Sequence, residues 1–151
     1  MTYARYLALD DLLACQHPQS ELDDEMLFII IHQTKELWLK QIIREMHLAK
    51  SQIQADALVR AYKALARVSR IQAVMTLSWD VLATLTPTDY MTFRHVLGTS
   101  SGFQSAQFRE FEAVLGRRDQ AGAGADKHSG MGMAEHLIEG SPARARVEAA
   151  M

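Results

Sequence analysis

The first 97 residues contain no glycine, and they contain proline only at positions 18 and 87. Apolar residues in this part recur at spacings of three and four rather than two, which is the period of a helix. Because glycine and proline are the residues that most often interrupt helices, their scarcity permits long uninterrupted ones. The sequence therefore predicts an all-α fold, a helical bundle of two long antiparallel helices with several shorter ones.

The expected helices follow from this periodicity and from local start signals. In chain order they are Tyr3–Leu13, a long helix from Ser20 or Asp23 to about Gln54, a second long one from about Ala57 to Leu82, a short one that contains Tyr90 and Arg94, and one from Phe103 to Leu115. Acidic residues crowd the first turn of the first long helix, as the helix dipole prefers. The stretch Thr86-Pro87-Thr88-Asp89 supplies a hydroxyl cap, a proline at the first helical position and a carboxylate that returns the bond.

The composition changes after Gly116. Residues 117–151 are rich in Gly and Ala and carry only a weak helical pattern. We expect residues 1–116 to form one helical domain and residues 117–151 to form a divergent, largely disordered tail. His128 and His136 lie in this tail without acidic or cysteine companions, and we expect both to be solvated.

Composition argues against several classes of protein. The formal net charge of -2 indicates no nucleic-acid partner. The start of the chain has no basic, apolar leader, and no apolar stretch approaches membrane-spanning length, so we expect a cytoplasmic protein without a membrane partner. Cys15 is the only cysteine, which excludes an internal disulfide, and we expect it to be a small, semi-buried side chain. No metal-ligand motif is present, so no metal-ligating residue is assigned.

A histidine follows directly on the apolar run in FIIIHQTKELW, residues 28–38. Phe28 and His32 are four residues apart and so share one side of a helix. Because Leu27 to Ile31 are all apolar, we expect little water to reach His32, and burial disfavours a charged imidazolium. A neutral imidazole could exchange a hydrogen bond with a polar atom of an otherwise apolar ligand. The alternative is a core histidine bonded to a backbone carbonyl.

Tyr90 and Arg94 form a second pair at this spacing, and a phenol beside a guanidinium suits a carboxylate. The alternative is a surface arginine stacked on a tyrosine. The sequence GTSSG at 98–102 could offer donors to an anion, but an ordinary turn between helices is the preferred explanation. Trp38 and Trp79 are large apolar groups at helical spacing, and we expect both in the core.

Two blocks, DDEMLFIIIHQTKELWLKQI (23–42) and LTPTDYMTFRHVLGTSSGFQSAQFREFE (85–112), closely resemble the tryptophan 2,3-dioxygenase family. The resemblance runs from about Tyr3 to Gly116, with no family pattern from Arg117 onward. It implies a truncated haem-dioxygenase-like fold, haem b as cofactor, a homotetramer, and oxidative opening of the indole ring of L-tryptophan by O₂ to N-formyl-kynurenine. The family's later half supplies the histidine that ligates the iron, and this sequence has no counterpart to it.

The resemblance also implies roles for particular residues. It makes His32 the catalytic residue, placed near the indole nitrogen to position it rather than to act as an obligatory base. The implied substrate pocket consists of Phe28, Ile29, Ile30, Ile31, His32, Tyr90 and Arg94, of which the last two hold the carboxylate. The residues implied to border the haem are Phe28, Trp79, Ser101 and Gly102. The residues implied to close a neighbouring subunit's site are Tyr3, Tyr6 and Leu7.

An alternative of a different class stays open. Without the iron ligand we expect weak haem binding, which fits a non-catalytic helical remnant that associates with itself or with a complete subunit. A haem absorption band and product formation distinguish the two hypotheses.

Overall fold

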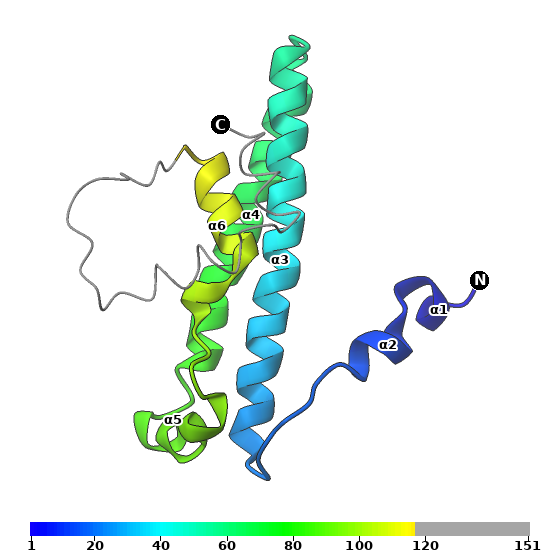
Figure 1. Ribbon diagram of the computed structural model, residues 1–151. Coiled ribbons are helices and arrows are strands. Elements are labelled where there is room, and N and C mark those ends of the chain that lie inside the picture. Colours follow the sequence, from blue (N-terminus) through cyan, green and yellow to red (C-terminus); the bar gives the residue numbers. More distant parts are fainter. Residues whose placement is uncertain (117–151) are drawn as a thin grey trace, which may run out of the picture. The chain divides into compact units, whose positions relative to one another are not determined.

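The structure is a computed structural model that describes residues 1–116, apart from the Phe103 side chain, and this part contains helices and no strand (Figure 1). The predicted all-α fold is confirmed. Its elements are α1 (Tyr3–Leu7), α2 (Leu9–Leu13), α3 (Asp23–Gln54), α4 (Leu58–Leu82), α5 (Pro87–Phe93), the 3₁₀ helices η1 (Arg94–Leu97) and η2 (Gly102–Gln104), and α6 (Ala106–Val114). No helix within residues 1–116 is long and apolar enough to cross a bilayer.

The described chain forms two compact units. The first unit contains residues 1–34 and 77–98, and the described part of the second contains residues 35–76 and 99–116. Each long helix contributes to both units, because α3 and α4 each continue across a unit boundary.

The second unit is built around aliphatic side chains of α3 and α4. Its core is Ile42, Val68 and Ile71, and the half-buried residues packed against this core are Trp38, Met46, Met75 and Phe111. Buried positions of α4 recur at spacings of three and four, which gives one continuous face, and small alanines at two of these positions allow a close helix approach. Figure 1 shows α3 and α4 side by side in this unit, with α6 alongside.

Polar contacts fix α6 in the second unit. The Gln107 side-chain amide donates to the Glu36 backbone carbonyl at 3.0 Å and to the Glu36 carboxylate at 2.7 Å. Two carboxylates are almost fully buried in this unit, Glu45 and Glu110. Glu45 accepts from the guanidinium of Arg67, so α3 and α4 are joined by an ion pair beside the apolar core. Buried carboxylates require such partners because desolvation of an unpaired charge is costly.

Local signals in the first unit set the helix starts. The Thr86 hydroxyl accepts from the Asp89 N–H at 3.2 Å, and the Asp89 carboxylate accepts from the Thr86 N–H at 3.1 Å, with Pro87 at the first helical position. The predicted capping box of α5 is therefore confirmed.

The start of α3 is held by Glu25, which is only 1% exposed. Its carboxylate accepts from the backbone N–H groups of Gln19 at 2.8 Å and Ser20 at 2.7 Å, and from the Ser20 hydroxyl. These bonds, led by the one from the Gln19 backbone, hold the pKa of Glu25 below its ordinary value. A single carboxylate thus anchors the segment that precedes α3.

Three predicted helix boundaries are corrected. The expected helix Tyr3–Leu13 is divided into α1 and α2, because Ala8 adopts a left-handed backbone with φ 49°. The short helix ends at Phe93, so Arg94 begins the 3₁₀ helix η1. The last helix starts at Ala106 rather than Phe103, because the Ser105 side chain caps it by accepting from the Phe108 N–H at 3.0 Å.

Two predictions of burial are wrong. Trp79 is 57% exposed rather than a core residue, whereas Trp38 packs against the core as expected. Cys15 is exposed, since it lies between α2 and α3, where its thiol donates to the Leu12 carbonyl at 2.9 Å. Residues 117–151, with His128 and His136, lie outside the described residues, and the expected domain over 1–116 stays a prediction.

Candidate functional site

Four rings meet in the first unit, and we call Phe28, His32, Tyr90 and Phe93 the aromatic cluster. Phe28 contributes the central ring, with centroids 4.1 Å from His32, 5.9 Å from Tyr90 and 5.7 Å from Phe93. Tyr90 and Phe93 lie 5.6 Å apart in an edge-on arrangement. The three longer separations are typical of aromatic pairs that attract each other, and Phe28 and His32 lie closer still. The cluster therefore joins α3 to α5 through ring contacts.

Phe93 is the residue of this cluster that the sequence analysis missed. It is fully buried, while Phe28, His32 and Tyr90 are half-buried. A detectable signal existed, because Phe93 follows Tyr90 by three residues and so shares its side of the helix. Phe93 makes edge-on contacts with Phe28 and Tyr90, which both stay partly accessible.

The three isoleucines between Phe28 and His32 face different surroundings. Ile29 is half-buried, Ile30 is 46% exposed and Ile31 is 7% exposed. Successive residues of a helix point about 100° apart, so these three side chains point in different directions.

His32 is half-buried, so it is less enclosed than the apolar run suggested. Its ring Nδ1 lies 2.7 Å from the backbone carbonyl oxygen of Phe28. Because a carbonyl oxygen can only accept, this bond assigns a proton to Nδ1, and the neutral ring then presents the lone pair of Nε2 as an acceptor. The bond of the core-histidine hypothesis is present, and it leaves the ring able to accept an N–H from a ligand.

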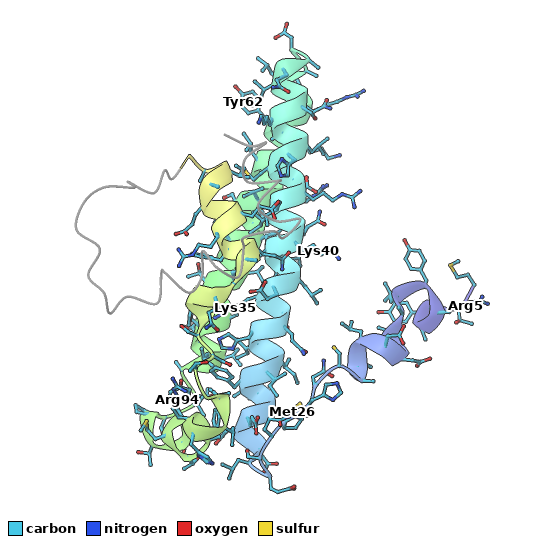
Figure 2. The ribbon with its side chains drawn as sticks, viewed as in Figure 1. Arg5, Met26, Lys35, Lys40, Tyr62 and Arg94 are labelled. Atoms are coloured by element: carbon cyan, nitrogen blue, oxygen red, sulfur yellow. The ribbon has the colours of Figure 1, made fainter. Side chains whose placement is uncertain are left out.

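Arg94 follows the cluster at the end of α5 (Figure 2). Its backbone N–H donates to the Tyr90 carbonyl, so the helical register between the two residues is kept. The Arg94 guanidinium donates to the Gly98 carbonyl at 2.9 Å, which closes a short loop around η1. A guanidinium has five N–H donors, and one bond of this kind leaves it able to bind a carboxylate.

The residues expected to border haem are divided between the units. Trp79 belongs to the first unit, and Ser101 and Gly102 belong to the second, where η2 begins. The Ser101 backbone N–H donates to the Gln104 side chain at 3.1 Å. A Cβ added at Gly102 would meet no atom within 4 Å, so the described chain itself does not require glycine there.

The N-terminal residues expected to reach a neighbour lie on α1, where no residue is buried. Tyr3 is 76% exposed, Tyr6 is 73% exposed and Leu7 is 40% exposed. The Thr2 side chain caps this short helix by accepting from the Arg5 N–H at 3.3 Å. Two large phenol rings are thus presented to solvent on one ordered turn.

One titratable group was missed by the sequence analysis. Lys35 lies in the second unit and is half-buried, and burial lowers the pKa of its ammonium. Within residues 1–116 no three or more His, Cys, Asp or Glu side chains gather as a site for a bare metal ion.

Comparisons with known proteins cover most of the chain. The sequence model of the family described as tryptophan 2,3-dioxygenase matches residues 1–128. This match extends beyond Gly116, so the prediction that the family pattern stops there is corrected.

Individual relatives agree with this match, and each is called tryptophan 2,3-dioxygenase. The protein from Caulobacter vibrioides is 66% identical over 121 residues, covering 80% of this chain and 46% of the relative. The Serratia proteamaculans protein is 48% identical over 138 residues, covering 87% and 49%, and the Bacillus cereus protein is 54% identical over 116 residues, covering 77% and 42%. The chain thus spans about half the length of the curated relatives it matches, and it belongs to the tryptophan 2,3-dioxygenase family.

Proposed function

We propose that this chain provides the tryptophan-binding residues of a haem enzyme that opens the indole ring of L-tryptophan with O₂ to give N-formyl-kynurenine. The observation that carries the proposal is the aromatic cluster, in which Phe28 stacks close to His32 and contacts the α5 rings that lead to Arg94. A half-buried set of rings, one imidazole and one guanidinium are the groups that an indole amino acid needs.

The proposed substrate-binding residues have separate roles. Phe28 and Tyr90 give apolar ring surface, with Ile29, Ile30 and Ile31 as the further apolar residues of the proposed pocket. His32 accepts the indole N–H at Nε2, because its Nδ1 proton is held by the Phe28 carbonyl. This contact orients the indole ring, so His32 acts by positioning and by holding a proton at Nδ1.

Arg94 and Tyr90 hold the substrate carboxylate in this proposal. A guanidinium pairs with a carboxylate through two parallel N–H bonds, and a phenol adds a third donor. Fixing the carboxylate at one end and the indole N–H at the other leaves the ligand a single orientation.

The proposed haem-bordering residues are Phe28, Trp79, Ser101 and Gly102. Two of them, each taken by itself, suit the border of a flat, largely apolar group. Trp79 is a large ring residue that is 57% exposed, and a Cβ added at Gly102 would meet no atom within 4 Å. Haem, when bound, supplies the redox chemistry that adds both atoms of O₂ across the indole C2–C3 bond. The residues of this chain bind the substrate, orient it and limit the access of water.

The first test uses the full chain loaded with haem. A Soret band together with N-formyl-kynurenine absorbance on addition of tryptophan and O₂ is the expected result. Haem binding without product supports the non-catalytic remnant instead, which has no observation of its own in its favour.

A sharper test compares tryptophan with tryptamine, which lacks the carboxylate. Arg94→Ala should weaken tryptophan binding by about 1.5–3 kcal/mol, roughly 10- to 150-fold, because a charge-assisted contact is lost. Tryptamine affinity should not change, and Arg44→Ala, at an exposed position of α3, should leave both ligands unaffected. Equal losses for both ligands in Arg94→Ala would refute the assignment, and calorimetric titration measures each affinity.

We further propose a cytoplasmic homotetramer in which Tyr3, Tyr6 and Leu7 close a neighbour's site, supported by the exposure of the α1 rings. The small net charge supports the absence of a nucleic-acid partner.

A complementation experiment tests whether α1 of one subunit closes the site of another. A Tyr3→Ala/Tyr6→Ala chain and an Arg94→Ala chain should each bind tryptophan weakly, whereas their co-assembly should restore part of the binding. A mixture no better than its two components would contradict this arrangement.

A further inference from the structure

We infer that Gly98 is a positioning residue for Arg94, and that its backbone conformation aims the guanidinium at the substrate carboxylate. That Arg94 binds the substrate carboxylate rests on the proposed function. The contact between Arg94 and Gly98 does not, because the Arg94 guanidinium donates to the Gly98 carbonyl at 2.9 Å within the chain itself.

The backbone at Gly98 explains why its carbonyl is available. Gly98 ends η1, and its N–H donates to the His95 carbonyl at 3.4 Å. Its φ of 55° with ψ of -124° lies in a region that residues with a Cβ rarely adopt. This combination turns the peptide sharply after the 3₁₀ turn, so that the Gly98 carbonyl faces the guanidinium only four residues earlier.

The consequence for binding is preorganisation. An arginine side chain loses much rotational freedom when it is fixed, and this loss weakens binding unless it occurs before the ligand arrives. The Gly98 carbonyl uses one of the five guanidinium donors and leaves the others to pair with a carboxylate. Arg94 is therefore held near its binding conformation by a carbonyl whose direction depends on a backbone conformation that L-residues with a Cβ rarely adopt.

The effect of a substitution at this position would come from the backbone alone. A Cβ at Gly98 would meet no atom within 4 Å, so alanine brings no steric clash with a neighbour. It would instead disfavour the positive φ, rotate the carbonyl and release Arg94. We expect Gly98→Ala to weaken tryptophan binding by about 2- to 12-fold, the range for one freed long side chain, and to leave tryptamine binding unchanged.

The matched control is Gly116→Ala. Gly116 also has a positive φ, 86°, and no atom within 4 Å of an added Cβ, but it follows α6 in the second unit. Gly116→Ala should lower the free energy of unfolding, as alanine at a positive φ generally does, and should leave the ratio of tryptophan to tryptamine affinity unchanged. A D-alanine placed at position 98 by semisynthesis favours positive φ and should restore the wild-type ratio, which covers the case in which Gly98→Ala folds poorly.

A second measurement does not depend on any ligand. The Arg94 guanidinium protons of the full chain should exchange slowly with water in ¹⁵N-resolved spectra, and Gly98→Ala should accelerate this exchange while D-alanine restores it. Unchanged exchange and unchanged tryptophan affinity in Gly98→Ala would overturn the inference, as would equal losses for both ligands. A wild-type chain that binds tryptamine as tightly as tryptophan would instead refute the proposed function, while the exchange rates would still decide the role of Gly98.

Discussion

The two units of the chain differ in what fills their interiors. The second unit buries aliphatic side chains, centred on Ile42, Val68 and Ile71, over much of the α3–α4 contact. The first unit buries only Glu25, Ile31 and Phe93, and ring contacts join its part of α3 to α5. Aliphatic side chains stabilise a core by close packing and have no polar atoms with which to bind a ligand. The partly accessible rings of the first unit include an imidazole and a phenol, which can hydrogen-bond to a ligand. From this difference we predict that the second unit contributes mainly to stability and that tryptophan recognition depends on the first unit.

Removing the fully buried ring of the first unit should have the largest effect. Phe93→Ala should lower the free energy of unfolding by about 3–5 kcal/mol, because a fully buried ring is lost and a cavity remains. Tryptophan binding should fall as well, since Phe93 supports Phe28 and Tyr90. Denaturant unfolding and calorimetric titration measure the two effects. Retained tryptophan affinity in the folded protein would break the link between this ring and the site.

The corresponding change in the second unit should separate stability from binding. Ile42→Ala should lower the free energy of unfolding by about 2–5 kcal/mol, because Ile42 is 0% exposed. The folded fraction should bind tryptophan with unchanged affinity. Ile53→Ala is the matched control, since Ile53 also lies on α3 but is 52% exposed, and it should change stability by less than about 1 kcal/mol. A large loss of affinity in Ile42→Ala would contradict the proposed division between units.

A smaller effect is expected at the start of α5. Thr86→Ala should lower the free energy of unfolding by about 0.5–2 kcal/mol, because the capping bond to the Asp89 N–H is lost. Thr76→Ala is a suitable control, since the Thr76 hydroxyl only returns to the Gln72 carbonyl within α4. The difference between the two variants in urea unfolding measures the cap. Equal effects would mean that the capping box adds little to the first unit.

The smallest expected effect is one of pH. Glu25 has a lowered pKa in the folded chain, so its contribution to stability is fully present above the ordinary value of 4.5 and is lost as the pH falls through the lowered one. The free energy of unfolding should therefore fall more steeply between neutral and acid pH in the natural chain than in Glu25→Gln. Glu21→Gln, at an exposed position nearby, should keep the natural slope. Identical slopes for the natural chain and Glu25→Gln would show that the segment before α3 is held by other contacts.

Much of the fold was predictable because its determinants are local. The bounds expected for the two long helices agree closely with α3 and α4. Helical periodicity and the absence of glycine are both read from residues that are close together in the sequence. The break at Ala8 was not predictable, because alanine seldom adopts a positive φ and no local signal marks it. The exposure of Trp79 was missed for a related reason, since spacing alone does not say whether a partner covers a face.

The candidate site likewise has features that the sequence determines and features that only the tertiary structure decides. The sequence by itself determined the chemical groups, namely the imidazole of His32 and the guanidinium of Arg94, and the cap that starts the helix leading to Arg94. Only the tertiary structure decided that Phe93 contacts Phe28 edge-on, and that Arg94 donates to the carbonyl of Gly98. The physical reason is range. Caps and helical periods depend on neighbours along the chain, whereas ring contacts and the direction of a carbonyl depend on how distant segments pack and which backbone conformations that packing selects.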